Sequence, residues 1–253
     1  MSIPEDFIEK AFKNLTKGKA IRISRLLDTL LTRLYDKDPY SNHHSQAVSK
    51  YSWFLAKRHK LKAHRIQLLV LASRYHDVGK TVFTDEMFSY EEPLTDDQWA
   101  IVRKHPETGF SEIFYLIESE FNSERLLWLS LILFHHRDYD GTGYPTSLLT
   151  DESKDYINRY NSRIQEALSP NVDGVQDEND LRLQLSVLHI ADAISAATSS
   201  MRSNKLKKRK SMSWIIQDIE GKSGKKYHPE VVSTVNQMGV SLWERFARDN
   251  ALI

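Results

Sequence analysis

Cysteine is absent from the 253-residue chain. Its absence excludes a disulfide-stapled scaffold, a zinc ribbon, an iron–sulfur cluster and a cysteine nucleophile. Glycine and proline are scarce too, with nine and seven copies, which excludes collagen-like and low-complexity chains. An all-β protein needs many hairpin turns, and those turns depend on the same kinds of residue. The composition therefore predicts an all-α fold.

Neither sign of charge dominates, since 35 Lys and Arg residues stand against 34 Asp and Glu residues. A net charge of +1 gives no reason to expect nucleic-acid binding over the whole surface. The basic run from Lys205 to Lys210 is more typical of a solvated segment than of a site for nucleic acid or an acidic partner.

Long apolar runs are missing as well. The longest, from Leu126 to Phe134, contains Ser130 and is too short to cross a bilayer. The first residues lack the basic and apolar segments of a signal peptide. We therefore expect a cytoplasmic protein with no membrane association.

Apolar residues recur at the spacing of helix faces through most of the chain. The predicted helices span residues 17–37, 43–60, 63–78, 95–118, 123–134, 181–200 and 229–251. A capping box from Thr95 to Gln98 opens the fourth, and Pro106 is expected to break or restart it, because proline lacks an amide donor. Residues 169–179 are rich in turn formers and are predicted to form a surface loop. No strand is predicted.

We divide the chain at residue 38. Residues 1–38 are expected to form an N-terminal helical extension, which serves either as a dimerisation stem of a homodimer or as a packing helix. Residues 39–253 carry all of the candidate chemistry described below and are expected to form one large domain.

The first candidate site is His76-Asp77-Val78-Gly79-Lys80, which follows an apolar helical segment. Adjacent helical residues point about 100° apart, so His76 and Asp77 can bind one metal while the carboxylate also reaches a second. Gly79 permits a sharp turn, and Lys80 supplies a cation suited to a phosphate. The alternative is a helix-end His and Asp that make ordinary caps.

The second candidate is the pair His135-His136, which ends a helix that is apolar on nearly every face. Two buried imidazoles need partners, and a metal ion supplies them. The alternative is a loop with a hydrogen-bonded histidine pair.

Three further candidates lie on other predicted helices. His44 stands early on its helix and competes with its neighbour His43, while His105 directly precedes Pro106. Asp192 lies in an apolar segment, where a lone buried carboxylate is costly unless it is paired or bound to a metal. For each of these residues alone, a capping or water-facing position is the alternative.

Together the candidates are five histidines and two aspartates from separate helices. Nitrogen and oxygen ligands without thiolates favour iron or manganese over zinc. The ligands exceed the four that one tetrahedral ion needs, so we predict two divalent metal ions. Two such ions can activate water and clamp a phosphoryl group during in-line displacement.

These motifs resemble those of the HD-GYP domain family, a branch of the HD metal-dependent phosphohydrolases. The resemblance runs from residue 40 to residue 235 and identifies residues 39–253 as an HD-GYP-type domain. It is carried by His44-Ser45-x-x-Val48, His76-Asp77-x-Gly79-Lys80, Leu94-Thr95, His105-Pro106-x-x-Gly109, His135-His136 with Asp140-Gly141-Thr142-Gly143-Tyr144-Pro145, Ala191-Asp192 and His228-Pro229-Glu230-Val231-Val232. The stretch from the histidine pair to Tyr144-Pro145 is its most specific part.

The resemblance implies an HD-domain helical bundle with a buried binuclear iron or manganese site, and hydrolysis of cyclic di-GMP to pGpG and GMP in bacterial signalling. The ligands it implies are His44, His76, Asp77, His105, His135, His136 and Asp192. It also implies that Asp77 bridges the metals and that Lys80 contacts the substrate phosphate, and we assign the catalytic roles to these two. Predicted substrate contacts are Lys80, Gly143, Tyr144, Pro145 and Arg202. Members with three metals carry a glutamate where this chain has Tyr40, so two metals are expected.

The sequence departs from the family pattern in two places. Arg137-Asp138 replaces the usual Glu-Arg after the histidine pair. The arginine that touches a nucleotide phosphate is replaced by Met201, with Arg202 one place along. Two alternatives to cyclic di-GMP hydrolysis therefore stay open: an HD phosphohydrolase for another nucleotide, such as hybrid cyclic GMP-AMP, and a low-activity module that senses a nucleotide or docks a partner. The loop up to Pro145 resembles one proposed to meet GGDEF domains, which makes a GGDEF-domain protein a candidate partner.

Overall fold

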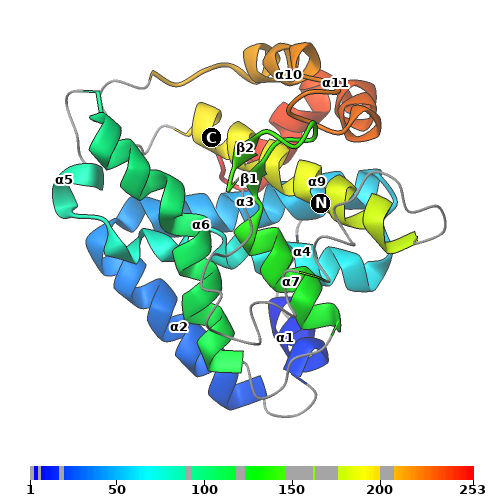
Figure 1. Ribbon diagram of the computed structural model, residues 1–253. Helices are drawn as coiled ribbons and strands as arrows, with labels where there is room; N and C mark the ends of the chain where they lie inside the picture. The colour runs from blue at the N-terminus through cyan, green and yellow to red at the C-terminus, as the bar shows by residue number, and fades with distance from the viewer. Residues whose placement is uncertain are drawn as a thin grey trace.

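The computed structural model describes residues 3–4, 7–16, 20–88, 93–117, 123–145, 162, 176–199 and 208–253. In this part of the chain the fold is almost entirely helical, which confirms the all-α prediction (Figure 1). The longer helices are α1 (Phe7–Thr16), α2 (Ala20–Lys37), α3 (Pro39–Arg58), α4 (Ala63–Tyr75), α6 (Asp96–Ile117), α7 (Ser123–Leu133), α9 (Gln176–Thr198), α10 (Met212–Gly221) and α11 (Pro229–Asp249). The short elements are the 3-10 helix η1 (Val78–Val82), α5 (Asp85–Phe88), β1 (His136–Arg137) and β2 (Gly143–Tyr144).

Helix α3 runs through the centre of the bundle (Figure 1). It packs against α2, α4, α9 and α11, and its side chains Val48, Tyr51 and Leu55 have no exposed surface. Helix α7 packs against α4, α6 and α9, while η1 lies against α6. This packing brings α3, the end of α4, α6, the end of α7 and α9 around one interior point.

The two N-terminal helices pack on the same bundle. Helix α1 contacts α2 and α4, and α2 contacts α3, α6 and η1. Leu27 and Leu31 of α2 belong to the main hydrophobic core. The division of the chain at residue 38, like the choice between a dimerisation stem and a packing helix, stays a prediction.

Helices α3 and α9 begin at other residues than predicted. Helix α3 begins at Pro39 rather than residue 43, because the Asp38 carboxylate accepts a hydrogen bond from the Ser41 amide at 3.1 Å and caps the helix. Helix α9 begins at Gln176, so residues 176–179 of the predicted surface loop are helical. Residues 169–175 lie outside the described part, and helices α5 and α10 were not predicted.

Pro106 does not break its helix, which corrects the prediction. Helix α6 is continuous from Asp96 to Ile117. Proline removes the amide that would bond to the Val102 carbonyl, but His105 Nδ1 donates to that carbonyl at 2.6 Å instead. The lost backbone bond is therefore replaced by a side-chain bond.

A two-stranded ribbon follows the histidine pair, where no strand was predicted. β1 and β2 pair antiparallel, with His136 opposite Tyr144 and Arg137 opposite Gly143. Gly143 has φ +85°, and a Cβ there would lie 2.3 Å from the His136 carbonyl oxygen. Only glycine fits this position, because both the conformation and the contact exclude a side chain.

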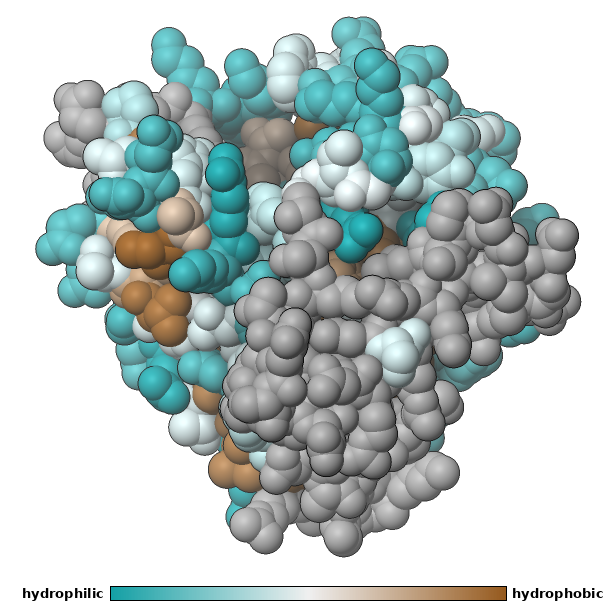
Figure 2. All heavy atoms as spheres, in the orientation of Figure 1, coloured by the Kyte–Doolittle hydropathy of each residue, from teal (hydrophilic) through white to brown (hydrophobic). Residues whose placement is uncertain are grey.

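The visible surface of the described residues is mostly hydrophilic, with apolar side chains in separate small patches (Figure 2). Among the described residues, no helix combines the length and the apolar character needed to cross a membrane. The apolar side chains are used instead to fill the interior around α3.

Candidate metal centre

The structure brings all seven predicted ligands to one interior region. They come from α3, the junction of α4 and η1, α6, the segment after α7, and α9. Their side chains form two groups, one built on His44, His76 and Asp77 and the other on His105, His135 and His136.

The first group combines two imidazoles with two carboxylates. His44 Nε2 lies 3.0 Å from Asp192 Oδ1 and 3.7 Å from Asp77 Oδ2. His76 Nε2 lies 3.4 Å from the same Asp77 oxygen and 3.9 Å from Asp192 Oδ1. The side chains of His44, His76 and Asp77 are at most 4% exposed, and that of Asp192 is 16% exposed. Asp192 therefore lies on the solvent-accessible edge of the group.

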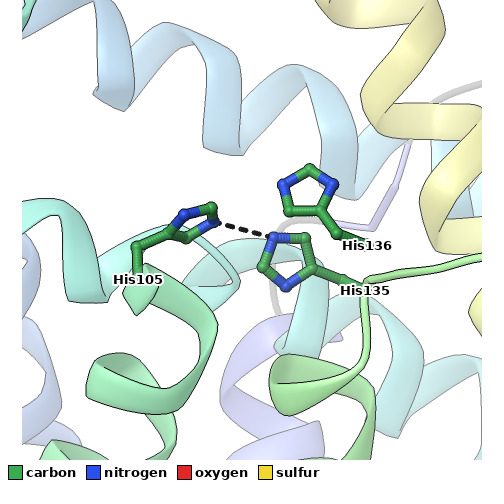
Figure 3. A group of neighbouring side chains, drawn as sticks. All are labelled: His105, His135 and His136. Atoms are coloured by element: carbon green, nitrogen blue, oxygen red, sulfur yellow. Dashed lines mark hydrogen bonds between the residues drawn. The ribbon is translucent and has the colours of Figure 1, made fainter. Parts of the chain in front are cut away.

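The second group consists of three imidazoles. His105 projects from α6, and His135 and His136 follow α7, so that the three rings converge (Figure 3). His105 Nε2 lies 3.1 Å from His135 Nε2 and 3.3 Å from Asp77 Oδ1. Asp77 thus directs one carboxylate oxygen to each group, which is the arrangement that a bridging ligand needs.

Hydrogen bonds on the far side of the imidazole rings fix their orientation. In three histidines, Nδ1–H donates to the carbonyl oxygen three residues earlier: His76 to Ser73 (2.9 Å), His105 to Val102 (2.6 Å) and His135 to Ile132 (2.7 Å). A carbonyl only accepts, so the proton of the neutral ring sits on Nδ1 and Nε2 presents a lone pair to the centre. Metal-binding histidines are oriented by partners of this kind.

These orientations leave a repulsion that a cation relieves. The Nε2 atoms of His105 and His135 face each other at 3.1 Å, the contact drawn dashed in Figure 3. Both nitrogens are acceptors once both Nδ1 atoms carry their protons. Nearby, the buried atoms His76 Nε2 and Asp77 Oδ1 have no hydrogen-bond partner in the described part of the chain. Acceptors that face one another without a donor fit a site for divalent metal ions.

The protonation states match the same interpretation. Burial lowers the pKa of His44 and His105, and it lowers the pKa of His135 and His136 far below the usual value. Burial alone would raise the pKa of Asp77, but the neighbouring His76 and Lys80 outweigh it and hold that pKa well below the usual range. Neutral imidazoles beside ionised carboxylates are the forms that bind metal ions.

His76 is the exception among the imidazoles. Burial lowers its pKa, but the carboxylates of Asp77 and Asp192 outweigh burial, and the pKa is raised. The two carboxylates thus favour positive charge at this position. A divalent ion bound there would supply that charge.

Comparison with known proteins identifies the family of the chain. A match to the HD domain family covers residues 43–197, which is more than half of the chain. The chain belongs to the HD domain family.

Several bacterial phosphodiesterases are similar to this HD domain. It is 31% identical over 122 residues to a cyclic di-GMP phosphodiesterase of Pseudomonas aeruginosa, covering 48% of this chain and 28% of that protein. It is 23% identical over 214 residues to a cyclic di-GMP phosphodiesterase of Thermotoga maritima, covering 84% of this chain and 48% of that protein. It is 31% identical over 111 residues to a 3'3'-cGAMP-specific phosphodiesterase of Vibrio cholerae, covering 43% of this chain and 20% of that protein. The chain thus spans less than half the length of each of these relatives.

Two solved structures share the fold. The HD domain of the L. monocytogenes phosphodiesterase PgpH, solved in complex with cyclic-di-AMP, has a TM-score of 0.50 at 18% identity and covers 86% of this chain and 96% of its own. Bd1817, an HDG"Y"P protein of Bdellovibrio bacteriovorus, has a TM-score of 0.51 at 14% identity and covers 92% of this chain and 67% of its own. At these identities the likeness shows the fold alone.

Other predicted site residues lie around the candidate metal centre. Lys80 Nζ lies 2.5 Å from Asp77 Oδ2, and its side chain is 26% exposed. The Tyr144 ring lies 4.7 Å from the His136 ring, and burial raises the pKa of its phenol. Pro145 follows Tyr144 through a cis peptide bond.

Three further residues of the prediction are placed as follows. Gly143 is packed against the His136 backbone, which gives it a role in the hairpin. The structure selects His44 over His43, which belongs to neither group. Arg202, the last predicted substrate contact, lies outside the described residues.

Two residues around the centre were not predicted, and both lie on α9. Ser195 Oγ lies 2.9 Å from His44 Nδ1 and orients that ring. His189 is buried with its ring 5.9 Å from the His136 ring, and its Nδ1 lies 3.8 Å from Asp138 Oδ1. Both stand three residues from Asp192, on the same helix face. That spacing was the signal in the sequence that would have found them.

Proposed function

We propose that this HD domain is an HD-GYP-type, metal-dependent phosphodiesterase that hydrolyses a cyclic dinucleotide, with cyclic di-GMP as the first candidate substrate. The observation that carries the proposal is the pair of ligand groups that meet at Asp77, whose two oxygens face His76 and His105 at 3.4 and 3.3 Å. Relatives of the chain carry the names of cyclic dinucleotide phosphodiesterases, which supports the proposal.

The centre has the donors for two divalent ions, and iron or manganese suits this set of nitrogen and oxygen ligands. One ion would be held by His44, His76, Asp192 and Asp77, and the other by His105, His135, His136 and the second oxygen of Asp77. When bound, such ions lower the pKa of a water nucleophile and neutralise charge on a phosphoryl group. Tyr40, which stands where three-metal members carry a glutamate, stacks on His44 at 5.6 Å. A phenol in that place adds no carboxylate for a third ion.

Lys80 is the residue we assign to the substrate phosphate. Its ammonium group reaches the centre beside Asp77, and the exposure of its side chain leaves it accessible to a ligand. A fixed cation there orients a phosphodiester and stabilises negative charge as it develops on the phosphoryl oxygens. The neutral Tyr144 phenol covers one side of His136 and restricts water at that ring.

A second candidate is a phosphodiesterase for the hybrid cyclic GMP-AMP. One relative of the chain carries the name of a 3'3'-cGAMP-specific enzyme and is as similar, at 31% identity, as the cyclic di-GMP enzyme of P. aeruginosa. Met201 also favours a substrate other than cyclic di-GMP, because it replaces the family arginine in the part of the pattern that contacts nucleotide. The GGDEF-domain partner, the homodimer and the cytoplasmic location stay predictions.

A substrate panel with a matched pair of variants tests the proposal. We expect protein reconstituted with Fe²⁺ or Mn²⁺ to hydrolyse at least one cyclic dinucleotide, and Asp77→Asn to lose both bound metal and turnover. Asp249→Asn is the control, because that exposed carboxylate at the end of α11 lies outside the centre. Metal content is measured by elemental analysis and products by chromatography. Undiminished turnover in Asp77→Asn, or no turnover of any cyclic dinucleotide by fully metallated protein, contradicts the proposal.

A further inference from the structure

The 3-10 helix η1 is bounded by residues that belong to the candidate metal centre or touch it. Asp77 stands directly before η1, Lys80 lies within it, and Phe83 follows its last residue. Phe83 is only 4% exposed, and its ring lies edge-on to the ring of His105 with 6.2 Å between the ring centroids. The position of η1 therefore affects both ligand groups and the residue that we assign to the substrate phosphate.

A 3-10 helix of five residues has few hydrogen bonds of its own. The amides of Lys80 and Phe83 donate to the carbonyls of Asp77 and Lys80, each at 2.9 Å. Bonds of this type have poorer geometry than those of an α-helix, and the last carbonyls of a helix have no partner within it. Buried carbonyls without a partner are costly. The end of η1 thus depends on a donor from elsewhere in the fold.

Helix α2 supplies that donor through its last residue, Lys37. The Lys37 ammonium group donates to the carbonyl oxygen of Thr81 at 2.8 Å and to that of Phe83 at 3.0 Å. Both acceptor residues are buried, and both hydrogen bonds are partly buried. Hydrogen bonds from an ionised donor are stronger than those between neutral groups. We call this pair of bonds the Lys37 clamp.

The other side of the clamp is fixed as well. Leu34 of α2 has no exposed surface, and its carbonyl accepts a hydrogen bond from the Asp38 amide at 2.9 Å. The Asp38 carboxylate in turn accepts the Ser41 hydroxyl at 2.7 Å in the first turn of α3. Because α3 carries His44, the junction of α2 and α3 holds the end of η1 in a fixed relation to a further candidate ligand.

We infer that Lys37 is a positioning residue of the metal centre. The clamp holds η1 where Asp77 can bridge the two ligand groups and where Lys80 can meet the substrate phosphate. Lys37 acts through two backbone carbonyls, so it is not itself a catalytic residue. The inference rests on the proposed function, because it names a residue on which the proposed centre depends.

A role in folding alone would have a different signature. If the clamp only stabilised the chain, its removal would lower the melting temperature and leave the metal affinity of the folded protein unchanged. If the clamp positions η1, its removal weakens metal binding even at temperatures where the protein is fully folded. Metal affinity of the folded chain therefore separates the two roles.

Substitutions at Lys37 test the inference in the full chain. Lys37→Met keeps most of the apolar stem and removes both hydrogen bonds. We expect it to weaken Mn²⁺ binding and to lower kcat/KM by about 10–100-fold, which is the usual loss when a group that orients a metal ligand is removed. Lys37→Arg should be close to wild type in both respects, because a guanidinium fork can also donate two hydrogen bonds.

Lys57→Met is the matched control. It removes the same charge from an exposed position in the last turn of α3, at the opposite end of that helix from His44, and should behave as wild type does. Mn²⁺ affinity is measured by calorimetric titration of the metal-free protein without substrate, and kcat and KM are measured with metallated protein. Melting curves set a temperature at which every variant is folded. Should Lys37→Met fail to fold, Lys37→Gln, which keeps one neutral donor, takes its place in the comparison.

Wild-type Mn²⁺ affinity in folded Lys37→Met would overturn the inference. So would equal losses in Lys57→Met, or a Lys37→Arg variant that is as impaired as Lys37→Met. The metal titration needs no substrate, so it tests the clamp whether or not a cyclic dinucleotide is hydrolysed. Absent turnover in the metallated wild type would contradict the proposed function, whereas unchanged metal binding without the clamp would contradict this inference alone.

Discussion

Gly79→Ala tests a close contact between two elements that position candidate metal ligands. Gly79 lies in η1 against α6, and an added Cβ would sit 2.0 Å from the His105 carbonyl oxygen and 2.5 Å from the Gly109 nitrogen. Both are backbone atoms, so neither can rotate away. The φ angle of Gly79 is not positive, so alanine can adopt its conformation, and the expected effect is one of contact alone.

The structure sets the size of the displacement. A Cβ essentially never lies closer than 3.0 Å to such an atom, so the 2.0 Å contact forces η1 and α6 apart by at least 1.0 Å. His105 lies on α6 and Asp77 directly precedes η1. His105 Nε2 and Asp77 Oδ1 are 3.3 Å apart. Metal sites tolerate errors of about 0.2 Å in ligand distance, and a misplacement of about 1 Å costs about 100-fold in rate.

We therefore expect Gly79→Ala to lose at least part of its bound metal and about 100-fold in turnover. Overpacking should also lower the free energy of unfolding by about 1–3 kcal/mol. Elemental analysis, turnover of the best cyclic dinucleotide and urea unfolding measure the three effects.

Gly221→Ala is the matched control, because a Cβ there meets nothing within 4 Å. It should be neutral or stabilise the protein by about 0.4–1 kcal/mol through the unfolded state. Wild-type metal content and turnover in Gly79→Ala would refute the reasoning, since η1 and α6 would then not need their present spacing.

Three more variants test how the ligands are held. Pro106→Ala supplies an amide that competes with His105 for a carbonyl, so we expect a more stable protein with weaker metal binding, measured by melting and by chelator competition. Ser195→Ala removes the partner of His44 Nδ1 and should weaken metal affinity by about 10–100-fold, with little change in the melting temperature; unchanged affinity would contradict the orienting role. Gly143→Ala should lower the free energy of unfolding by more than 1 kcal/mol, because φ is +85° and the Cβ would lie 2.3 Å from a carbonyl oxygen; urea unfolding detects this, and wild-type stability would contradict it.

The capping box shows how far local sequence reasoning reaches. The Thr95 amide donates to Gln98 Oε1 at 2.9 Å and the Gln98 amide to Thr95 Oγ1 at 3.3 Å, so this prediction is confirmed. It succeeds because both partners lie within one helical turn. Pro106 shows the opposite case, in which the local rule predicts a break and a side chain of the same helix replaces the missing bond.

His44 and His189 show what local sequence reaches and what it misses. The residues taken alone left His43 and His44 both open, and the resemblance favoured His44 through its motif with Ser45 and Val48. The structure places Asp192 Oδ1 and Ser195 Oγ, both on α9, at 3.0 and 2.9 Å from the two ring nitrogens of His44. His189 was missed because its neighbours His136 and Asp138 come from the segment after α7.

By itself, the sequence determined the helical class, the chemical types of the ligands and the motifs that carry them, because composition, periodicity and short-range capping act within a few residues. Tertiary structure alone decided how Asp77 divides its two oxygens between the ligand groups and how Ser195 and His189 of α9 are placed beside His44 and His136. These features depend on the packing of α3, α6, α7 and α9 around one point. Packing of that kind joins residues more than a hundred positions apart, at distances that no local pattern encodes.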